Sequence, residues 1–391
     1  MPANHELNHC SIAIVGAGLA GLACAVVLRA QGHAVTLIGP AGNAADTRTT
    51  ALLEGSVQAL AKAGVVIAGN PAAAPLRVMS IVDATQRLIR ARPIAFEAKE
   101  IGLDAFGWNI ANGALTQALL NRLAELEIEH VTGRLLSVDI ADGHVGLTID
   151  GAEPLTAGLV IAADGRNSMV RQAAGIGTTR HDYPQTALAL NLRVSRDHRE
   201  ISTEFHTESG PFTLVPLPGR RASLVWVVSP ERAEALKELD DAALAHEIEK
   251  QSHALLGRVS IDSQRSFWPM NTVMATSQSG TRIALIGEAA HVLPPIGAQG
   301  FNLTLRDIAA LAKALRDAKD PGASAVLDAY VKARRADIGT RHTAVDLLNR
   351  SLLSDQFALQ GLRGLGLYAL ERIGPLRRVV MRQGLARAVE D

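Results

Sequence analysis

The sequence predicts an α/β fold in which an open parallel sheet is interleaved with an antiparallel β-sheet domain and followed by a C-terminal helical segment. Three observations lead to this prediction. A glycine-rich strand–turn–helix–strand unit opens the chain, and later apolar strands end beside a glycine and an acid. The middle of the chain alternates apolar and polar residues with a period of two. The 391 residues suffice for two or three domains.

The composition narrows the class of protein. Hydrophobic residues make up 48% of the chain, which permits a large buried core. Lys plus Arg and Asp plus Glu both number 39, and this zero net charge argues against a nucleic-acid-binding protein, which usually carries a basic excess. Aromatic residues at 3% also leave few platforms for stacking bases. Nucleic acid is therefore not among the partners we expect.

Cysteine usage and the amino terminus favour a cytoplasmic protein. Cys10 and Cys24 stand neither in a CxxC pair nor at zinc spacing, and the opening MPANHELNHC lacks the features of a secretory signal. The charge-free run over residues 11–28 is long enough to span a membrane. However, β-branched residues cluster before Gly16 and helix formers follow Gly21. We therefore interpret this run as a strand, a turn and a helix.

The first unit predicts a dinucleotide-binding turn. Gly16, Gly18 and Gly21 form a GxGxxG motif after an apolar strand, and an apolar helix up to Gly32 and a second strand over residues 34–38 follow. The first glycine allows a tight turn, the second lets the backbone approach a pyrophosphate, and the third permits close helix–strand packing. The helix amino terminus adds free N–H groups and a positive dipole end. The complete β-α-β context disfavours the alternative of a glycine-rich turn without a ligand.

One position departs from this pattern. The second strand of such a unit normally ends in Asp or Glu, which binds the adenosine ribose hydroxyls. This chain has Gly39 there, followed by Pro40, and no arginine that would favour a 2′-phosphate. The ribose must therefore be bound by backbone groups, water or another residue.

Two downstream segments add polar residues to the predicted site. DTRTTAL, over residues 46–52, is predicted to open another apolar helix, where Arg48 would suit phosphate oxygens because guanidinium presents a fork of donors. The alternative for Arg48 is an exposed surface residue. The segment over residues 108–126 predicts a short strand and a helix with Asn112 near its N-cap, and a plain cap is the alternative for Asn112.

Two further buried strands end beside an acid. The strand in LVIAADGRNSMVR ends in Asp164-Gly165, and the strand in RIALIGEAAH ends in Gly287-Glu288. In open α/β sheets ligands bind at the carboxyl ends of the strands, so these residues and the GxGxxG turn are expected at one edge. Binding motifs that lie this far apart in the sequence are typical of a single extended ligand that contacts several segments of one domain.

The middle of the chain, over residues 183–273, predicts antiparallel strands that cover the substrate. Runs such as TALALNLRV and ASLVWVVS alternate with a period of two. The candidates for lining a substrate cavity are His206, Phe212, Trp226 and Trp268, and the alternative for each is an ordinary core residue.

Together these motifs resemble the flavin-dependent aromatic hydroxylases of the para-hydroxybenzoate hydroxylase fold group, and most of all their ubiquinone-biosynthesis branch. The resemblance rests on GAGLAGL, DTRTTAL, AADGRNSMVR and GEAAHVLPPIGAQGFNLTLRD, in that order, and covers most of the chain. It implies a Rossmann-like FAD-binding domain formed by residues 1–72, 101–178 and 274–345. It further implies a substrate-binding β-sheet domain formed by residues 73–100 and 179–273, and a helical tail over residues 346–391.

The resemblance also implies which residues contact FAD. The acid of the late motif is usually Asp and contacts the ribityl hydroxyls, whereas this chain has the longer Glu288. Pro294 and Pro295 would wall the reaction site beside the flavin ring, with Pro295 as the catalytic-site residue. The helix that is expected to begin near Phe301-Asn302 would aim its positive end at reduced flavin. The implied cofactor-binding residues are Gly16, Gly18, Gly21, Arg48, Asn112, Asp164, Gly165, Gly287, Glu288, Gly297, Gly300, Phe301 and Asn302.

The implied activity is FAD-dependent hydroxylation, with oxygen, of the ring of a prenylated phenol or quinol in ubiquinone biosynthesis. Alternatives are a hydroxylase of a small soluble aromatic acid, a non-catalytic flavoprotein subunit of a quinone-synthesis assembly, and an isoprenoid reductase. A halogenase is disfavoured because no WxWxIP-type stretch is present. No separate nicotinamide domain is visible, so NAD(P)H is expected to donate electrons transiently, unless a redox protein delivers them. HEIEK at His246 lacks the second histidine of a zinc motif, and no metal is expected.

The tail over residues 351–391 has six arginines, four acids and interspersed leucines. It could contact the inner face of the membrane, where a prenylated substrate is found. The alternative is a helix packed on the enzyme's own body or on a partner subunit of a homo-oligomer or quinone-synthesis complex.

Overall fold

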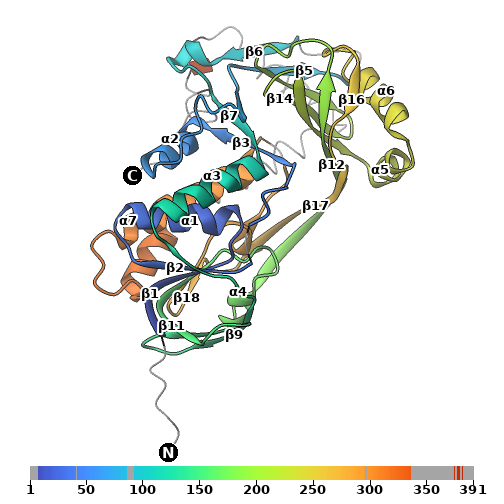
Figure 1. Cartoon of the computed structure of the whole chain (residues 1–391). Helices are drawn as coiled ribbons and strands as arrows, with labels where there is room; N and C mark the ends of the chain where they lie inside the picture. Colours follow the sequence, from blue (N-terminus) through green and yellow to red (C-terminus); the bar gives the residue numbers. More distant parts are fainter. Residues whose placement is uncertain are drawn as a thin grey trace, which may run out of the picture.

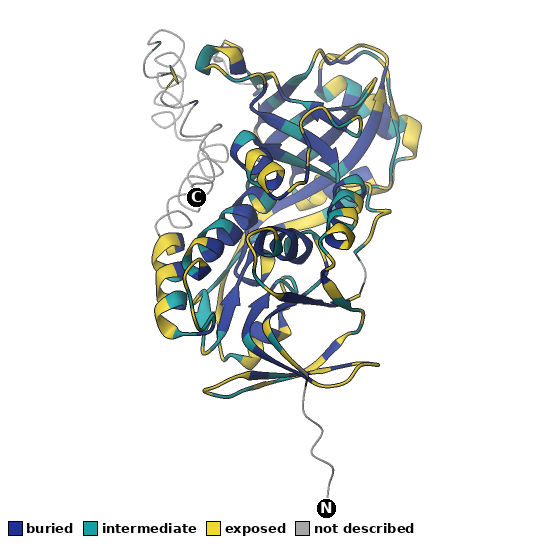
Figure 2. Cartoon of the chain, turned by 60° about the vertical axis from the view of Figure 1, so that its left-hand side comes forward, coloured by how far each residue is buried: buried dark blue, intermediate teal, exposed yellow. Residues whose placement is uncertain are grey.

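The computed structural model describes residues 8–40, 42–85, 92–295 and 297–335, together with Gly374, Arg377, Arg378 and Met381. The described strands form three sheets (Figure 1). One is mainly parallel and lies against the long helices, one is mainly antiparallel and lies at the other end of the molecule, and a three-stranded sheet lies between them. Figure 2 shows that buried residues concentrate in the sheets and on the inner faces of the helices.

The mainly parallel sheet has the strand order β18-β19-β11-β1-β2-β8. β1 pairs in parallel with both β2 and β11, and β11 pairs in parallel with β19. A meander of β9 and β10 is attached to β11 by antiparallel pairing. The strands are β1 (Asn8–Val15), β2 (Val35–Ile38), β8 (Glu129–Val131), β9 (Leu135–Ile140), β10 (Val145–Ile149), β11 (Leu155–Ala162), β18 (Ser279–Gly280) and β19 (Ile283–Leu285).

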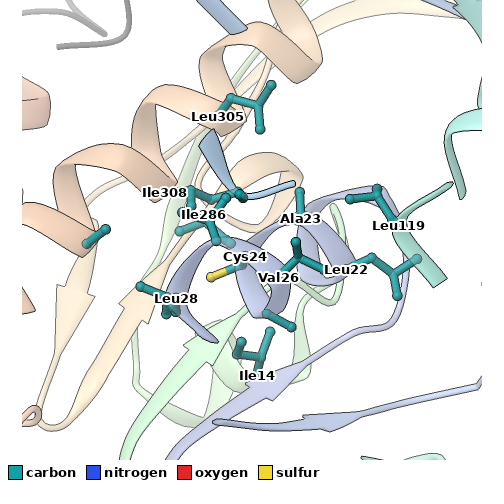
Figure 3. Close-up of a cluster of buried hydrophobic side chains, with 14 of the residues drawn as sticks. Ile14, Leu22, Ala23, Cys24, Val26, Leu28, Leu119, Ile286, Leu305 and Ile308 are labelled. Atoms are coloured by element: carbon teal, nitrogen blue, oxygen red, sulfur yellow. The ribbon is translucent and has the colours of Figure 1, made fainter. Parts of the chain in front are cut away.

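Helices cover the parallel sheet. The buried side chains of α1 pack against both α3 and α7, and Figure 3 shows Cys24 of α1 on the side of Ile286 and of Ile308 of α7. Burial raises the pKa of the Cys24 thiol, so it remains protonated and belongs to the core. A further helix covers residues 324–335. The helices are α1 (Leu19–Ala30), α2 (Glu54–Lys62), α3 (Asn112–Glu125), α4 (Met169–Ala173) and α7 (Gln299–Leu315).

The second sheet has the strand order β20-β17-β12-β15-β14-β13-β5-β6, with β16 beside β12. Its pairings are antiparallel except that of β13 with β5. One face packs onto α5 (Pro230–Lys237) and α6 (Asp241–Gln251). The strands are β5 (Val78–Asp83), β6 (Ile94–Glu97), β12 (Thr178–Val194), β13 (Ile201–Thr207), β14 (Gly210–Leu217), β15 (Arg221–Val228), β16 (Val259–Ile261), β17 (Ser266–Ala275) and β20 (His291–Val292).

Several predictions about local structure are confirmed. The run over residues 11–28 contains most of β1, the turn and the start of α1, as interpreted from its composition. Residues 183–273 supply the antiparallel strands β12 to β17. No helix among the described residues is long and apolar enough to cross a membrane. The domain boundaries stay a prediction, although β5 and β6 join the antiparallel sheet while β8 to β11 join the parallel one.

One predicted helix start is wrong. Residues 49–53 of the DTRTTAL segment form β3 (Thr49–Leu53), which pairs with β7 (Gly107–Ala111), and β7 also pairs with β4 (Ala73–Pro75). Adjacent threonines favour the pleated strand, so the helix α2 starts only at Glu54. The late helix is confirmed: α7 starts at Gln299, within two residues of the expected Phe301. The predicted tail helix lies outside the described residues, apart from the four isolated positions.

Candidate active site

A cavity of about 460 Å³ lies between the two large sheets. It has two walls, which we name the loop wall and the sheet wall. The loop wall comprises Thr47, Arg48, Thr49, Asn112, Arg166, Glu288, Val292, Leu293, Pro294 and Pro295. The sheet wall comprises Ala187, Ala189, Leu190, Asn191, Ser223, Leu224, Val225, Ser263, Gln264, Trp268, Pro269, Met270 and Asn271.

Arg48 and Asn112 meet at one end of the loop wall. Asp46 accepts hydrogen bonds from Arg48 Nε at 2.9 Å and Nη2 at 2.7 Å, and from Asn112 Nδ2 at 3.1 Å. Burial tends to raise the pKa of Asp46, but these donors outweigh burial and lower it, so the carboxylate is ionised. The Arg48 side chain remains half exposed, and its guanidinium lies 5.9 Å from the Trp268 ring centroid on the sheet wall.

Glu288 also lies on the loop wall, in the short 3-10 helix η2 (Gly287–Ala289). Its carboxylate lies 3.5 Å from Arg166 Nε, and both side chains are exposed to the cavity. Arg171 is buried and donates to the carbonyl oxygens of Ala289 at 2.9 Å and Arg166 at 2.8 Å. Arg171 therefore fixes the two backbone segments that carry the Arg166–Glu288 pair.

The proline loop closes the loop wall before α7. Pro294 and Pro295 line the cavity, Gly297 follows, and Gly300 lies in the first turn of α7. No side chain caps α7, and its first turn contains no acid. The N–H groups at this helix start can therefore serve a ligand.

Phe301 and Asn302 do not line the cavity. Phe301 packs against the core of the helical layer. Asn302 is buried: its Nδ2 donates to the Ala51 carbonyl at 2.8 Å, and its Oδ1 accepts from Leu53 N at 2.9 Å. These bonds join the start of α7 to β3, so the structure gives Asn302 an anchoring position.

The glycine-rich turn has the geometry that a pyrophosphate site requires. A Cβ on Gly16 would lie 2.4 Å from the Ala163 carbonyl oxygen, and one on Gly21 only 1.7 Å from that of Gly16. Gly18 differs, because a Cβ there would meet nothing within 4 Å. α1 has no side-chain cap and no acid in its first turn. The turn therefore combines close packing at two glycines with open space and uncapped N–H groups at the third.

Gly39 has a backbone that excludes the usual acid. Its φ is +142°, and a Cβ would lie 3.0 Å from Ala17 N. Only glycine adopts this conformation without strain, so no acidic side chain fits there. His130 Nε2 lies 2.9 Å from the Gly39 carbonyl oxygen.

Asp164 provides an acceptor near the turn. Its Oδ2 accepts from Met169 N at 2.8 Å and Val170 N at 3.2 Å, at the start of α4. Its Oδ1 is buried, and no hydrogen-bond partner for it exists among the described residues. Gly165 follows in a turn with open space around its Cα. An unpartnered buried carboxylate oxygen fits a hydroxyl-bearing ligand.

Of the four candidates for the substrate cavity, only Trp268 lines it. Phe212 and Trp226 pack edge to face at 5.2 Å on the opposite face of the sheet, against α5 and α6. His206 is buried 2.8 Å from Glu204. These three are ordinary core residues, which is the alternative that the sequence left open for each. Alternation along a strand places neighbours on opposite faces, and the sequence does not show which face is covered.

Arg166 and Asn191 are two polar residues of the cavity that were not singled out from the sequence. Arg166 stands inside the recognised AADGRNSMVR segment, so its positive charge within that motif could have indicated a residue of the site. Asn191 gave no local signal: it lies in β12 and its Nδ2 donates to the Thr47 carbonyl at 2.7 Å. This bond ties the Arg48 segment to the sheet wall. The structure thus gathers Arg48, Asn112, Glu288 and the proline pair around one cavity, whereas the glycine turn, Asp164 and α7 lie beside it.

Comparisons with known proteins agree with this arrangement. Residues 9–344 match the family model described as FAD binding domain. The chain is 33% identical to 3-demethoxyubiquinol 3-hydroxylase of Escherichia coli, over 96% of this chain and 98% of that protein. It is 32% identical to the ubiquinone hydroxylase UbiL of Rhodospirillum rubrum, over 96% and 89% respectively. The fold is similar to that of p-nitrophenol 4-monooxygenase from Pseudomonas putida, with a TM-score of 0.80, 18% identity and coverage of 97% and 99%.

Proposed function

The chain belongs to the FAD-binding-domain family of FAD-dependent aromatic monooxygenases, and from this membership we propose that it hydroxylates the aromatic ring of a prenylated phenol or quinol in ubiquinone biosynthesis. The similarity to two ubiquinone hydroxylases over nearly their full lengths supports this substrate class.

The sheet wall is the observation that supports a neutral, apolar substrate. All of its described lining residues are uncharged, and they are contributed mainly by β12, β15 and β17. The Asn, Gln and Ser side chains of this wall offer a carboxylate neutral donors but no cation, and burying an ionised carboxylate without a charged partner costs several kcal/mol, roughly. Arg48 and Arg166 lie on the loop wall and are already paired with acids. A small aromatic acid is therefore the less favoured substrate.

FAD fits the loop wall and the glycine turn. The uncapped N–H groups of α1 beside Gly18 would receive the pyrophosphate, and Asp164 Oδ1 and Glu288 would accept from hydroxyl groups of the cofactor. When bound, reduced FAD together with oxygen supplies the oxygen transfer to the ring. The protein's part is orientation and exclusion of water. Pro294 and Pro295 present a wall without N–H donors, and the sheet wall presents an uncharged surface.

The electron donor that we propose is NAD(P)H, bound transiently. The described residues contain one dinucleotide turn, which FAD would occupy, so a second nucleotide has no dedicated domain among them. Substrate-stimulated oxidation of NADH or NADPH by the purified holoenzyme would test this. A holoenzyme that accepts electrons only from a reduced redox protein would contradict it.

The tail residues that the structure describes pack against the enzyme's own body. Arg377 donates to both carboxylate oxygens of Glu100 at 2.7 Å, and Met381 is buried with Phe96 and Phe106. This supports a self-packed tail over a membrane-bound one. Liposome co-sedimentation of the full chain and of a chain truncated after residue 350 separates the two, because a self-packed tail predicts no loss of binding on truncation.

The first test is the quinone profile of a strain that lacks the gene. A prenylated intermediate one oxygen short is expected, and complementation with the wild type should remove it. An unchanged quinone pool would contradict the proposal and direct attention to small aromatic acids. Complementation by Glu288→Ala as well as by the wild type would instead identify a non-catalytic flavoprotein subunit.

A further inference from the structure

A fully buried carboxylate lies behind the loop that carries Glu288 and Pro295. Asp307 is in the third turn of α7 and its side chain has no exposed area. Its Oδ2 accepts from Gly287 N at 3.0 Å and lies 2.7 Å from His291 Nε2. One oxygen atom therefore contacts both the first residue of η2 and the first residue of β20.

The helix over residues 324–335 completes the arrangement. Arg334 Nε donates to Asp307 Oδ1 at 2.7 Å, and Tyr330, one turn earlier on the same face, donates from its hydroxyl to the Leu285 carbonyl at 2.7 Å. Arg334 and Tyr330 are both buried. The end of β19 is thus fixed by Tyr330, and the turn that follows it is fixed by Asp307.

The ionised carboxylate of Asp307 and its partners His291 and Arg334 hold one another in place. Burial tends to raise the pKa of Asp307, but His291, Arg334 and the Gly287 N–H outweigh burial and lower it, so the carboxylate is ionised. A buried charge that loses one partner is strongly destabilised, because no water replaces the lost contact. The groups that face Asp307 therefore hold fixed positions relative to one another.

His291 also links the loop to the substrate sheet. It lies in β20, where Val292 and His291 pair with Val273 and Met274 of β17. The next three residues, up to Pro295, line the cavity. The His291 side chain thus contacts Asp307 behind the loop, while the His291 backbone pairs with β17, the strand that carries Trp268.

We infer that Asp307 is a positioning residue that, through Gly287 and His291, sets where the loop over residues 287–295 meets FAD and the substrate sheet. This inference rests on the proposed FAD site. Asp307 lies outside the lining of the cavity, so it acts only through the residues that it binds.

The test compares Asp307→Asn with Asp320→Asn. Asp320 forms a bidentate ion pair with Arg282 at the amino-terminal end of β19, so its loss removes a carboxylate–guanidinium pair away from the loop. The Asp320 side chain is 46% exposed whereas Asp307 is buried, and the unfolding midpoints account for this difference. For each apoprotein the FAD dissociation constant is measured by flavin fluorescence quenching, and the midpoint of thermal unfolding is measured in parallel. We expect Asp307→Asn to weaken FAD binding at least about tenfold and Asp320→Asn less than about twofold, since hydrogen bonds to a charged group are among the strong ones.

A second pair of variants keeps the inference testable if Asp307→Asn fails to fold. His291→Gln retains an N–H donor for Asp307, whereas His291→Leu removes it. Near-native FAD affinity in the glutamine variant and weakened binding in the leucine variant support the positioning role. Unchanged FAD affinity in Asp307→Asn or His291→Leu, with only a lower unfolding midpoint, would overturn it. Failure of the wild type to bind FAD would instead contradict the proposed function itself.

Discussion

The two walls of the cavity are built on different principles. The loop wall is polar, and its residues are placed by buried side chains such as Arg171, Asn302 and Asp307 that bind backbone atoms. The sheet wall is neutral, and its residues are placed by alternation along β12, β15 and β17. A wall that binds a charged, polar cofactor needs hydrogen-bond donors and acceptors in defined directions. A wall that binds a neutral ring and an alkyl chain needs a surface complementary in shape. Substitutions on the two walls should therefore change different measured quantities.

The two tryptophans of the antiparallel sheet should separate stability from substrate binding. Trp226 is buried against α5 and α6, so Trp226→Ala should lower the free energy of unfolding by about 3–5 kcal/mol. Trp268 is 47% exposed, so Trp268→Ala should lower it by less than about 1 kcal/mol, the size of its contact with Arg48. Urea unfolding measures both. The KM for the prenylated substrate should rise only in the Trp268 variant, and equal stability losses would contradict the assignment of faces.

The glycines of the turn should separate folding from cofactor binding. Gly21→Ala places a Cβ 1.7 Å from the Gly16 carbonyl oxygen and should destabilise the apoprotein by about 3 kcal/mol. The methyl group added by Gly18→Ala contacts no atom of the apoprotein, so the unfolding midpoint should stay near that of the wild type. FAD binding should weaken, because the methyl group occupies the space that the pyrophosphate would approach. Calorimetry of the apoproteins and FAD titration check this. A Gly18→Ala protein with native FAD affinity would show that the pyrophosphate does not approach this position.

A charge placed on the sheet wall should affect the substrate and leave the cofactor unaffected. Val225 faces the cavity beside Ala189, and Val225→Arg should lower kcat/KM for a prenylated phenol by at least about 100-fold because the cation buries unpaired. Val225→Ile is the matched neutral control. Aromatic acids should become better substrates of the arginine variant, and a parallel loss of FAD affinity would mean that the two walls are not independent.

Acid should remove the stability that Asp307 contributes. Its pKa in the folded protein is lowered, so this contribution is fully present above the ordinary carboxyl pKa of about 4 and is lost as the pH falls through the folded value. The difference in unfolding free energy between the wild type and Asp307→Asn should therefore be largest near neutral pH and shrink in acid, by at most about 1.4 kcal/mol per pH unit. A difference that does not vary with pH would show that the charge of Asp307 contributes nothing.

The features that were predictable from the sequence are those that depend on neighbouring residues. Gly16, Gly18 and Gly21 define their turn within six residues, and the alternation in the middle of the chain identifies its strands. Arg48 lines the cavity, but the sequence predicted it at the start of a helix and the structure has it just before a strand, because an apolar run after two threonines fits a strand as well as a helix.

The remaining features depend on contacts between distant segments. Whether Phe212 or Val225 faces the substrate is set by which side of the sheet α5 and α6 cover, and no local pattern states this. Asp307 stands in an amphipathic helix, where an acid normally indicates the exposed face. Its burial follows only from contacts with His291 and Arg334, which come together when the fold is complete.

The backbone at Gly39 also limits how the protein could be redesigned. The residue at the end of the second strand is the usual point at which a dinucleotide site gains an acid for one cofactor or a cation for another. With φ at +142° and Ala17 N only 3.0 Å from a Cβ, a single substitution there strains the chain before any new side chain reaches a ribose. Cofactor preference would therefore have to be changed by remodelling the loop after Pro40, so insertions in that loop are the more promising design variable.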